Sequence, residues 1–311
     1  MKIGALIVTT GLQQASGVAA LLSQVGSISA GQRMISAFQC VDASLVALVV
    51  GPEEKKAERQ LAQNGVIFLH TSEDTGFFQG LQDGLSFMRD KFHRVFVVPG
   101  DVPLFLPATL KTMLQSTASL VVPENKHVNG YPLLLDEQAM DFLLSQPDFA
   151  AAKEAVQQGQ LSLESIRVED SGILLRSGDM THRKQLIQHH NRQLSRPVAE
   201  ISLCNGRTLY DSRLSMLLHL VEETHSVRDA CSLMQISYSA AWNMLNHVED
   251  ELGFPLVVRI RGGSTGSGSV LTEKGRQLMD AYDRFSGHLN AEASKLYQQI
   301  FSGLPDEDPA I

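Results

Sequence analysis

Cysteine is scarce in this chain of 311 residues, which contains three, at positions 40, 204 and 231. Cys40, Cys204 and Cys231 form no CxxC pair, and none lies beside a group of other metal-ligating residues. A disulfide framework and a zinc site both need several such residues at close spacing. The sequence therefore predicts neither, and we expect the three thiols to be buried and inert.

Long apolar runs and an excess of positive charge are also absent. No stretch approaches the roughly 18 apolar residues of a membrane span, and the apolar run 3–8 is too short for the core of a signal peptide. We therefore expect a soluble, cytoplasmic protein without membrane contact. The formal net charge of -8 argues against a chain whose whole surface coats nucleic acid. It still allows a local basic surface on one domain.

Short apolar runs alternate with amphipathic segments through the first half of the chain. The runs are 3–8, 45–50, 66–69, 95–98 and 120–122. Strands that are apolar along their whole length are typical of a parallel sheet with helices on both faces. The sequence thus predicts a three-layer, Rossmann-like α/β domain with its ligand site at the carboxyl ends of the strands. A helical pattern follows, which predicts domains of residues 1–194 and 195–311.

The C-terminal part begins with three helix signals, each preceded by a residue that can cap a helix. Asp211 precedes 213–224, Ser226 precedes 227–234, and Ser237 precedes 238–252. Two short helices joined by a tight connection have the layout of a helix-turn-helix. Asn can pair with adenine, and Ser or Tyr can reach phosphates. The side chains expected to contact DNA from the third helix are Tyr238, Ser239, Asn243, Asn246 and His247.

A glycine-rich segment, 262–268, follows the predicted helix-turn-helix. The short strand-like segments 256–261 and 269–271 flank it, and this arrangement predicts a β-hairpin wing. The wing corner has a local positive charge suited to phosphates, from Arg259, Arg261, Lys274 and Arg276. The alternative is an oligomerisation module with an ordinary surface hairpin.

A long helix is predicted from Thr272 onward. Its apolar residues follow an approximate heptad, which the small winged domain cannot cover, so we expect them to pack on a second copy of the chain. The predicted homodimer interface contains Leu278, Tyr282, Phe285, Leu289 and Leu296, and the stripe continues to Ile300.

The segments 236–242, 256–259, 262–268 and 270–275 resemble the DNA-binding domain of molybdate-responsive ModE-type regulators, which are related to LysR-type winged helices. This resemblance implies double-stranded DNA as a partner and a homodimer as the assembly. The chain ends soon after the long helix, without the molybdate-binding modules that follow it in ModE-type proteins. Any effector domain is therefore expected to be N-terminal.

The segments 76–85, 95–104 and 129–132 carry a second resemblance, to the nucleotidyltransferases that attach CMP or GMP to the molybdenum cofactor. These enzymes have the MobA-like NTP transferase fold. The resemblance implies a nucleotide or molybdopterin-type ligand bound by Gly11, Gly17, Gly80 and Asp101. It also implies Asp101 as a ligand of Mg²⁺, because a carboxylate at a strand end can hold this ion against phosphates. A structural Asx turn would explain the same aspartate.

The cations of a working transferase loop are missing from residues 11–22. In the family, an Arg and a Lys neutralise the triphosphate as pyrophosphate leaves, and Ala15 and Ala20 stand in their places here. Arg33 is expected to be a surface residue rather than a replacement. A later Asp-rich motif that supplies a second metal ligand retains only Asp179. These losses predict a transferase-like fold that binds a ligand without catalysing nucleotide transfer. We therefore assign no catalytic residue.

The histidines near the end of the first domain are His182, His189 and His190. Neighbouring positions in a helix point to different faces, so these residues do not indicate a metal site. We expect them to lie at a solvated helix end.

The two halves together predict a transcriptional regulator linked to molybdenum and molybdopterin cofactor metabolism. In this hypothesis the degenerate transferase domain senses a nucleotide, a pterin-type cofactor or a related small-molecule effector. An alternative is an active nucleotidyltransferase, dependent on CTP or GTP, that also regulates transcription. A third is a scaffold whose α/β domain binds a protein partner. The uncharged loop favours the first.

Overall fold

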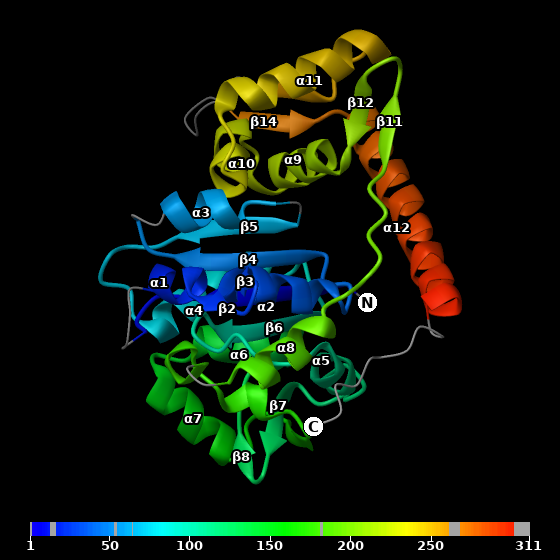
Figure 1. Cartoon of the computed structure of the whole chain (residues 1–311). Helices are drawn as coiled ribbons and strands as arrows, with labels where there is room; N and C mark the ends of the chain where they lie inside the picture. The colour runs from blue at the N-terminus through cyan, green and yellow to red at the C-terminus, as the bar shows by residue number, and fades with distance from the viewer. Residues whose placement is uncertain are drawn as a thin grey trace. The chain divides into compact units, whose positions relative to one another are not determined.

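The computed structural model describes residues 2–12, 17–52, 55–63, 65–180, 183–260 and 268–301. The chain divides into two compact units, Met1–Ser195 and Arg196–Ile311. Figure 1 draws the first in blue to green and the second in green to red. The order of elements changes at this division, from alternating strands and helices to mainly helices.

A mostly parallel sheet forms the centre of the first unit. Its strand order is β10-β7-β9-β6-β1-β4-β5, with β8 paired to β7. The strands are β1 (Ile3–Val8), β4 (Leu45–Val50), β5 (Val66–His70), β6 (Arg94–Pro99), β7 (Leu120–Asn125), β8 (Val128–Asn129), β9 (Leu133–Asp136) and β10 (Leu163–Arg167). Among the described strands of this sheet, β8 runs antiparallel to β7, and β9 runs antiparallel to both β6 and β7; the other pairs are parallel. The predicted class, α/β with a mostly parallel sheet, is confirmed.

The sequence does not predict the strands β9 and β10. β9 is four residues long and pairs antiparallel between β6 and β7, without a helix before it to mark a new strand of the alternating pattern. β10 pairs only with β7 at the edge of the sheet, and most of its side chains are exposed. An edge strand of this kind has no continuous apolar run to mark it.

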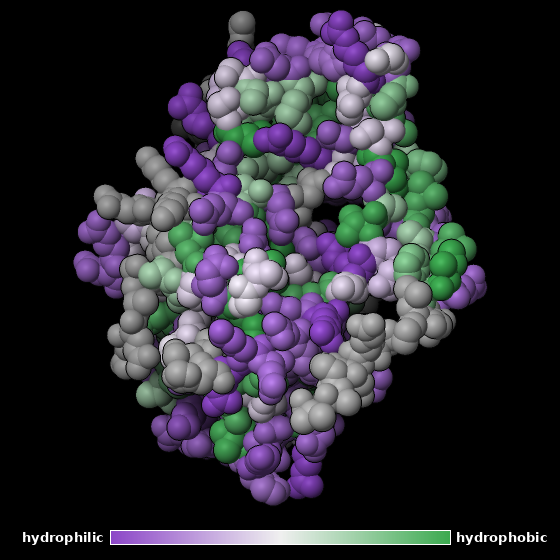
Figure 2. Space-filling view, in the orientation of Figure 1, coloured by the Kyte–Doolittle hydropathy of each residue, from purple (hydrophilic) through white to green (hydrophobic). Residues whose placement is uncertain are grey.

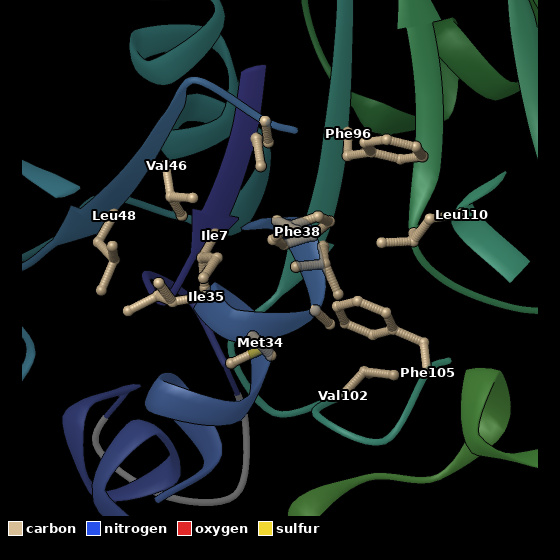
Figure 3. Packing of buried hydrophobic residues seen from close by; sticks show 14 of the residues in the cluster. Ile7, Met34, Ile35, Phe38, Val46, Leu48, Phe96, Val102, Phe105 and Leu110 are labelled. Atoms are coloured by element: carbon tan, nitrogen blue, oxygen red, sulfur yellow. The ribbon is translucent and has the colours of Figure 1, made fainter. Parts of the chain in front are cut away.

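Helices cover both faces of the sheet. They are α1 (Gly17–Leu22), α2 (Ala30–Gln39), α3 (Lys55–Leu61), α4 (Phe77–Met88), α5 (Pro107–Met113), α6 (Glu137–Ser145), α7 (Phe149–Gln157) and α8 (Lys184–Arg192), with the short hairpin β2 (Gln24–Val25) and β3 (Ile28–Ser29) before α2. Ile7 of β1 shares an apolar cluster with Met34 and Phe38 of α2 (Figure 3). The next side chain, Leu6, meets α4 instead, because a Cβ at Gly84 would lie 2.5 Å from Leu6 Cδ1. Successive residues of a strand face opposite sides, so α2 and α4 occupy different layers.

Three phenylalanines fill the centre of the cluster between the sheet and α2. The ring of Phe38 lies 5.7 Å from that of Phe96 and 5.1 Å from that of Phe105, measured between centroids (Figure 3). Aromatic rings at such distances pack favourably beyond the area that they bury. Phe105 belongs to the segment that follows Asp101, so the core fixes one end of the predicted ligand site.

The second unit contains a helix-turn-helix, a hairpin and a long terminal helix. Its elements are β11 (Ser202–Cys204), β12 (Thr208–Asp211), α9 (Ser212–Thr224), α10 (Val227–Met234), α11 (Tyr238–Leu252), β13 (Val257–Ile260), β14 (Gly268–Leu271) and α12 (Glu273–Phe301). The predicted caps are present: Asp211, Ser226 and Ser237 each accept a hydrogen bond from the backbone N–H three residues later, at 2.9 to 3.2 Å. The sequence does not predict the β11–β12 ribbon.

Two expectations drawn from composition can be compared with the structure. Among the residues it describes, no helix is long and apolar enough to cross a membrane. Cys231 is buried and Cys40 half-buried, but Cys204 is exposed. The expectation of a buried thiol is therefore wrong for Cys204, which lies in the two-stranded β11–β12 ribbon.

Candidate nucleic-acid interface and candidate ligand site

One face of α11 carries polar side chains that reach solvent. Tyr238, Ser239, Asn243 and Asn246 are exposed, and His247 is half-buried. The last three exposed positions are spaced by four and three residues, which places them on one side of the helix. The opposite side packs into the unit through Ala241, Leu245 and Val248. The predicted DNA-contacting residues therefore share an accessible surface, with His247 at its margin.

Aromatic rings hold positive charges next to this face. The Arg259 guanidinium lies 4.8 Å from the centre of the Trp242 ring, and the Arg228 guanidinium lies 5.8 Å from that of Tyr238. Such stacking fixes the direction of a long cationic side chain. The sequence prediction does not include Arg228 and Trp242 among the residues that contact DNA. The spacing of four residues between Tyr238 and Trp242 does indicate that the two rings lie on the same side of the helix.

The predicted wing is the hairpin β13–β14, paired from Val257 with Leu271 to Ile260 with Gly268. Glu249 Oε1 of α11 accepts hydrogen bonds from the backbone N–H groups of Leu256 and Val257, at 2.7 and 3.0 Å. The wing is thus attached directly to α11. Arg261, also predicted to contact DNA, lies outside the described residues.

Thr272 joins the wing to α12, and Gly275 lies in the first turn of that helix. Thr272 Oγ1 donates to the carbonyl of Pro255 at 2.7 Å and accepts from the Gly275 N–H at 3.0 Å. A Cβ at Gly275 would lie 2.5 Å from the Leu256 carbonyl oxygen. Glycine is therefore required here by the close approach of two backbones. Lys274 is exposed, with its ammonium 4.8 Å from the centre of the Phe254 ring, whereas Arg276 is paired with Glu222 at 2.6 Å and adds less free charge than the sequence suggests.

The helix α12 carries a row of exposed apolar side chains. Phe285, Leu289, Leu296 and Ile300 are 39 to 66% exposed, and Leu278 is half-buried. Figure 2 shows hydrophobic residues gathered over this helix. In the described part of unit 2, these side chains have no apolar layer covering them.

Tyr282 does not belong to this exposed row. It is only 4% exposed, its ring packs 4.8 Å from that of Tyr210, and its hydroxyl donates to the Ile201 carbonyl at 2.7 Å. The prediction that Tyr282 lies at the dimer interface is thus at odds with the structure, which uses this residue to hold α12 to its own unit. A second tether nearby joins Asp283 to His219 of α9, at 2.5 Å.

The predicted ligand site in the first unit begins where β1 ends. A Cβ at Gly11, which has a φ of +68°, would lie 2.3 Å from the Phe77 backbone nitrogen. A Cβ at Gly80 would lie 2.1 Å from Thr10 Oγ1. Both glycines therefore let α4 approach the end of β1, which is a packing role. Gly17 begins α1, and Ala15 lies outside the described residues.

Asp101 follows β6 and forms an ion pair. Its Oδ2 lies 2.5 Å from Nη1 of Arg176, and the exposed fractions of the two side chains are 15% and 47%. The Asp101 Oδ1 atom is buried and has no hydrogen-bond partner among the described residues. Asp179 Oδ2 accepts a hydrogen bond from the Arg176 N–H at 3.1 Å. The two predicted metal-binding carboxylates therefore both contact Arg176.

Arg33 is fully buried, so the prediction of a surface residue is wrong. Its Nε donates to Asn191 Oδ1 at 3.0 Å, and its Nη1 donates to the Phe105 carbonyl at 2.9 Å and to that of Pro103. Burial lowers the pKa of Arg33 to about 10, although the nearby Asp170 carboxylate acts in the opposite direction. The guanidinium stays charged at neutral pH, and its hydrogen bonds offset part of the cost of its burial, although Nη2 has no partner among the described residues.

His190 is buried beside Arg33, which corrects the prediction of a solvated helix end for this residue. Its Nδ1 lies 2.8 Å from the Leu104 carbonyl, to which it donates. Burial lowers its pKa, so the ring is neutral at pH 7. His189 is exposed as expected, and His182 lies outside the described residues.

Asp170 completes this buried polar cluster. Its carboxylate accepts hydrogen bonds from the Leu106 N–H at 2.8 Å, from Thr109 Oγ1 at 2.6 Å and from the Gly172 N–H at 2.9 Å. Together with Arg33 and His190, it fixes the segment 103–106 that follows Asp101. The sequence prediction misses this cluster because its members are far apart along the chain.

A hollow of about 360 Å³ lies at the edge of the sheet, between α5 and β10. It is lined by Thr112, Gln115, Ser116, Glu164, Ser165, Ile166 and Arg167. None of these residues is among those predicted to bind a ligand. The hollow therefore gives no support to the predicted site.

The fold and the surfaces described above define a chain with an NTP transferase-like domain and a winged helix-turn-helix. Comparison with protein families agrees: residues 17–164 match the MobA-like NTP transferase domain, and residues 213–276 match the bacterial regulatory helix-turn-helix proteins of the lysR family. Both resemblances stated from the sequence are thereby confirmed.

Curated relatives of this chain include ModE proteins. The molybdenum transport protein ModE of Azotobacter vinelandii is 34% identical over 95 residues, which are 30% of this chain and 35% of that protein. The DNA-binding transcriptional dual regulator ModE of Escherichia coli is 31% identical over 96 residues, 31% of this chain and 33% of that protein. The chain thus spans about a third of the length of these relatives.

Solved structures similar to this chain include nucleotidyltransferases. A nucleotidyl transferase from Methanothermobacter superposes with a TM-score of 0.51 at 14% identity, over 60% of this chain and 98% of that one. A 4-diphosphocytidyl-2C-methyl-D-erythritol synthase from Anaerococcus prevotii gives 0.50 at 12% identity, over 60% and 96%. At such low identity, these similarities establish the fold alone.

Proposed function

We propose that this protein is a homodimeric, DNA-binding transcriptional regulator linked to molybdenum cofactor metabolism, with its NTP transferase-like unit as the sensor of a small molecule. The observation that carries the proposal is the polar face of α11, flanked by the stacked cations Arg228 and Arg259, in a segment that matches the lysR-family helix-turn-helix. The link to molybdenum rests on the ModE relatives.

Asn243 and Asn246 are the residues proposed to read bases. A duplex is first selected from a random library with the full chain, and affinity is then measured by fluorescence anisotropy. N243A or N246A should weaken binding to the selected duplex by about tenfold or more, but change binding to a scrambled duplex little. N129A, at an exposed asparagine of the first unit, is the matched control. Equal losses on both duplexes would contradict base reading by α11.

Arg259 is proposed to bind phosphates from the wing. R259A should weaken binding to all duplexes alike and lower the dependence on salt by about one released counterion. An unchanged salt dependence would remove Arg259 from the interface. The stacking on Trp242 supports this role, because it holds the guanidinium beside α11.

The exposed row on α12 is proposed to form the interface between two copies of the chain. F285E or L289E should give monomers in sedimentation experiments and lose DNA affinity together, since a two-fold dimer binds paired half-sites. Q298E changes an exposed position off this row and is the matched control. A wild-type protein that sediments as a monomer at micromolar concentration would contradict this part of the proposal.

A further inference from the structure

Arg176 lies between the two 3₁₀ helices Ser171–Leu174 and Ser177–Met180, at the position where the resemblance to transferases implies a metal ion. Its guanidinium pairs with Asp101, and its backbone N–H bonds the Asp179 carboxylate. The next residue strengthens this arrangement, because the Ser177 N–H donates to the Asp101 carbonyl at 2.7 Å. Arg176 is therefore held to both carboxylates at once.

The residues at this position do not fit a resident divalent cation. Mg²⁺ binds carboxylates that carry free negative charge, but Arg176 already neutralises Asp101 and would repel a second cation beside it. In the described part of the chain, no group of three or more His, Cys, Asp or Glu residues could hold a metal ion. The other carboxylate oxygen, Asp101 Oδ1, is buried and has no hydrogen-bond partner among the described residues.

We infer that Arg176 is the anion-binding group of this site and that a phosphate-bearing ligand binds there without a divalent metal ion. The inference rests on the proposed sensor function. A guanidinium has five N–H donors in a planar fork that matches phosphate oxygens. The contact with Asp101 uses Nη1, and nearly half of the side chain is exposed. The remaining N–H groups of the guanidinium can thus donate to phosphate oxygens, in a site whose loop sequence, 11–22, contains no cation.

Tyr131 lies close to the ion pair. Burial raises the pKa of its phenol, with a smaller opposing effect from Arg176 and a reinforcing one from Asp101. The phenol is therefore protonated at neutral pH, and it adds no negative charge that would repel an anion. Its backbone N–H bonds the Ile173 carbonyl at 3.0 Å, which holds it near the segment that carries Arg176.

The test is calorimetric titration of the full chain with GTP, CTP and inorganic pyrophosphate, in excess EDTA and in excess MgCl₂. We expect at least one probe to bind in EDTA, no more weakly than in Mg²⁺, because Mg²⁺ removes charge from the probe. R176Q should weaken binding in EDTA by about tenfold or more, as expected for a lost charge-assisted contact. R167Q removes an exposed arginine paired with Glu124 at 3.5 Å and should bind like the wild type.

Three results would overturn the inference. Binding that requires Mg²⁺ would do so while leaving the sensor function intact, and so would an R176Q variant that binds as tightly as the wild type. Absence of binding by every probe in both buffers would overturn the inference, while a sensor of a ligand without a triphosphate or pyrophosphate group would still stand. DNA binding by the second unit is measured separately and would be unaffected. R176Q leaves the mostly buried Asp101 carboxylate unpaired, so its unfolding midpoint is expected to fall. Circular dichroism of R176Q at the titration temperature, equal to that of the wild type, shows that any loss of binding is local.

Discussion

Replacement of the fully buried Arg33 by Met should lower the free energy of unfolding of the first unit. Met keeps an unbranched apolar stem but is shorter than Arg and cannot donate hydrogen bonds. The Pro103 and Phe105 carbonyls and the Asn191 side chain would lose the donors that they now have. Each buried acceptor left unpaired costs about 1–3 kcal/mol.

The expected net loss is smaller than the sum of these costs. The lowered pKa of Arg33 shows that burial disfavours its charged form. At neutral pH, both the folded and the unfolded chain hold this proton, so the cost of burying the charge is fully present and Met removes it. We therefore expect R33M to lower the free energy of unfolding by about 3 kcal/mol. For a unit of this size, such a loss lowers the midpoint by about 6–12 °C.

The chain offers a way to follow its two units separately. Its one tryptophan, Trp242, lies in the second unit, so tryptophan fluorescence reports that unit, while far-UV circular dichroism reports both. R33M should lower the transition of the first unit and leave the fluorescence transition unchanged. R59M, at an exposed position of α3, is the matched control. If R33M and R59M melt within about 1 °C of each other, the hydrogen bonds of Arg33 do not stabilise the fold as argued.

Three further predictions concern the first unit and its chemistry. Burial lowers the pKa of His190, so the stability of the first unit should be full above its unfolded pKa of about 6.5 and fall as the pH drops below it; H190N should flatten this dependence in thermal melts. G84A should cost about 1–3 kcal/mol in denaturant unfolding, because its Cβ would meet Leu6, whereas G287A, in open space on α12, should not destabilise the second unit. Pyrophosphate release from CTP or GTP, assayed with molybdopterin and Mg²⁺, should stay at background, and robust release that D101A abolishes would establish the enzyme alternative.

Local signals account for the parts of the fold that the sequence predicts well. The starts of α9, α10 and α11 follow from Asp211, Ser226 and Ser237, whose side chains cap helices within three residues of themselves. The wing follows from the glycine-rich segment between two short strand-like segments. In each case, the residues that decide the structure are neighbours in the chain.

The misses have a common physical cause, which is dependence on distant partners. The hydrogen-bond acceptors of the buried Arg33 include residues 70 and 158 positions away in the sequence. The residues next to Arg33 in the chain therefore do not indicate that it is buried. Tyr282 shows the same effect. Its position fits the heptad of α12, but its ring packs on Tyr210 and its hydroxyl donates to the Ile201 carbonyl. Arg176 is also of this kind, since its importance appears only once Asp101 is placed beside it.

The position of α8 has a consequence for how the two units could be exchanged or separated. The match to the MobA-like family ends at residue 164, yet α8 supplies His190 and Asn191 to the buried cluster around Arg33. A cut at the end of the family match would leave that cluster open to water. A recombination event that joins the first unit to a different second unit must therefore keep the chain through Leu194. The structural boundary of the first unit thus lies some thirty residues beyond the end of its family match.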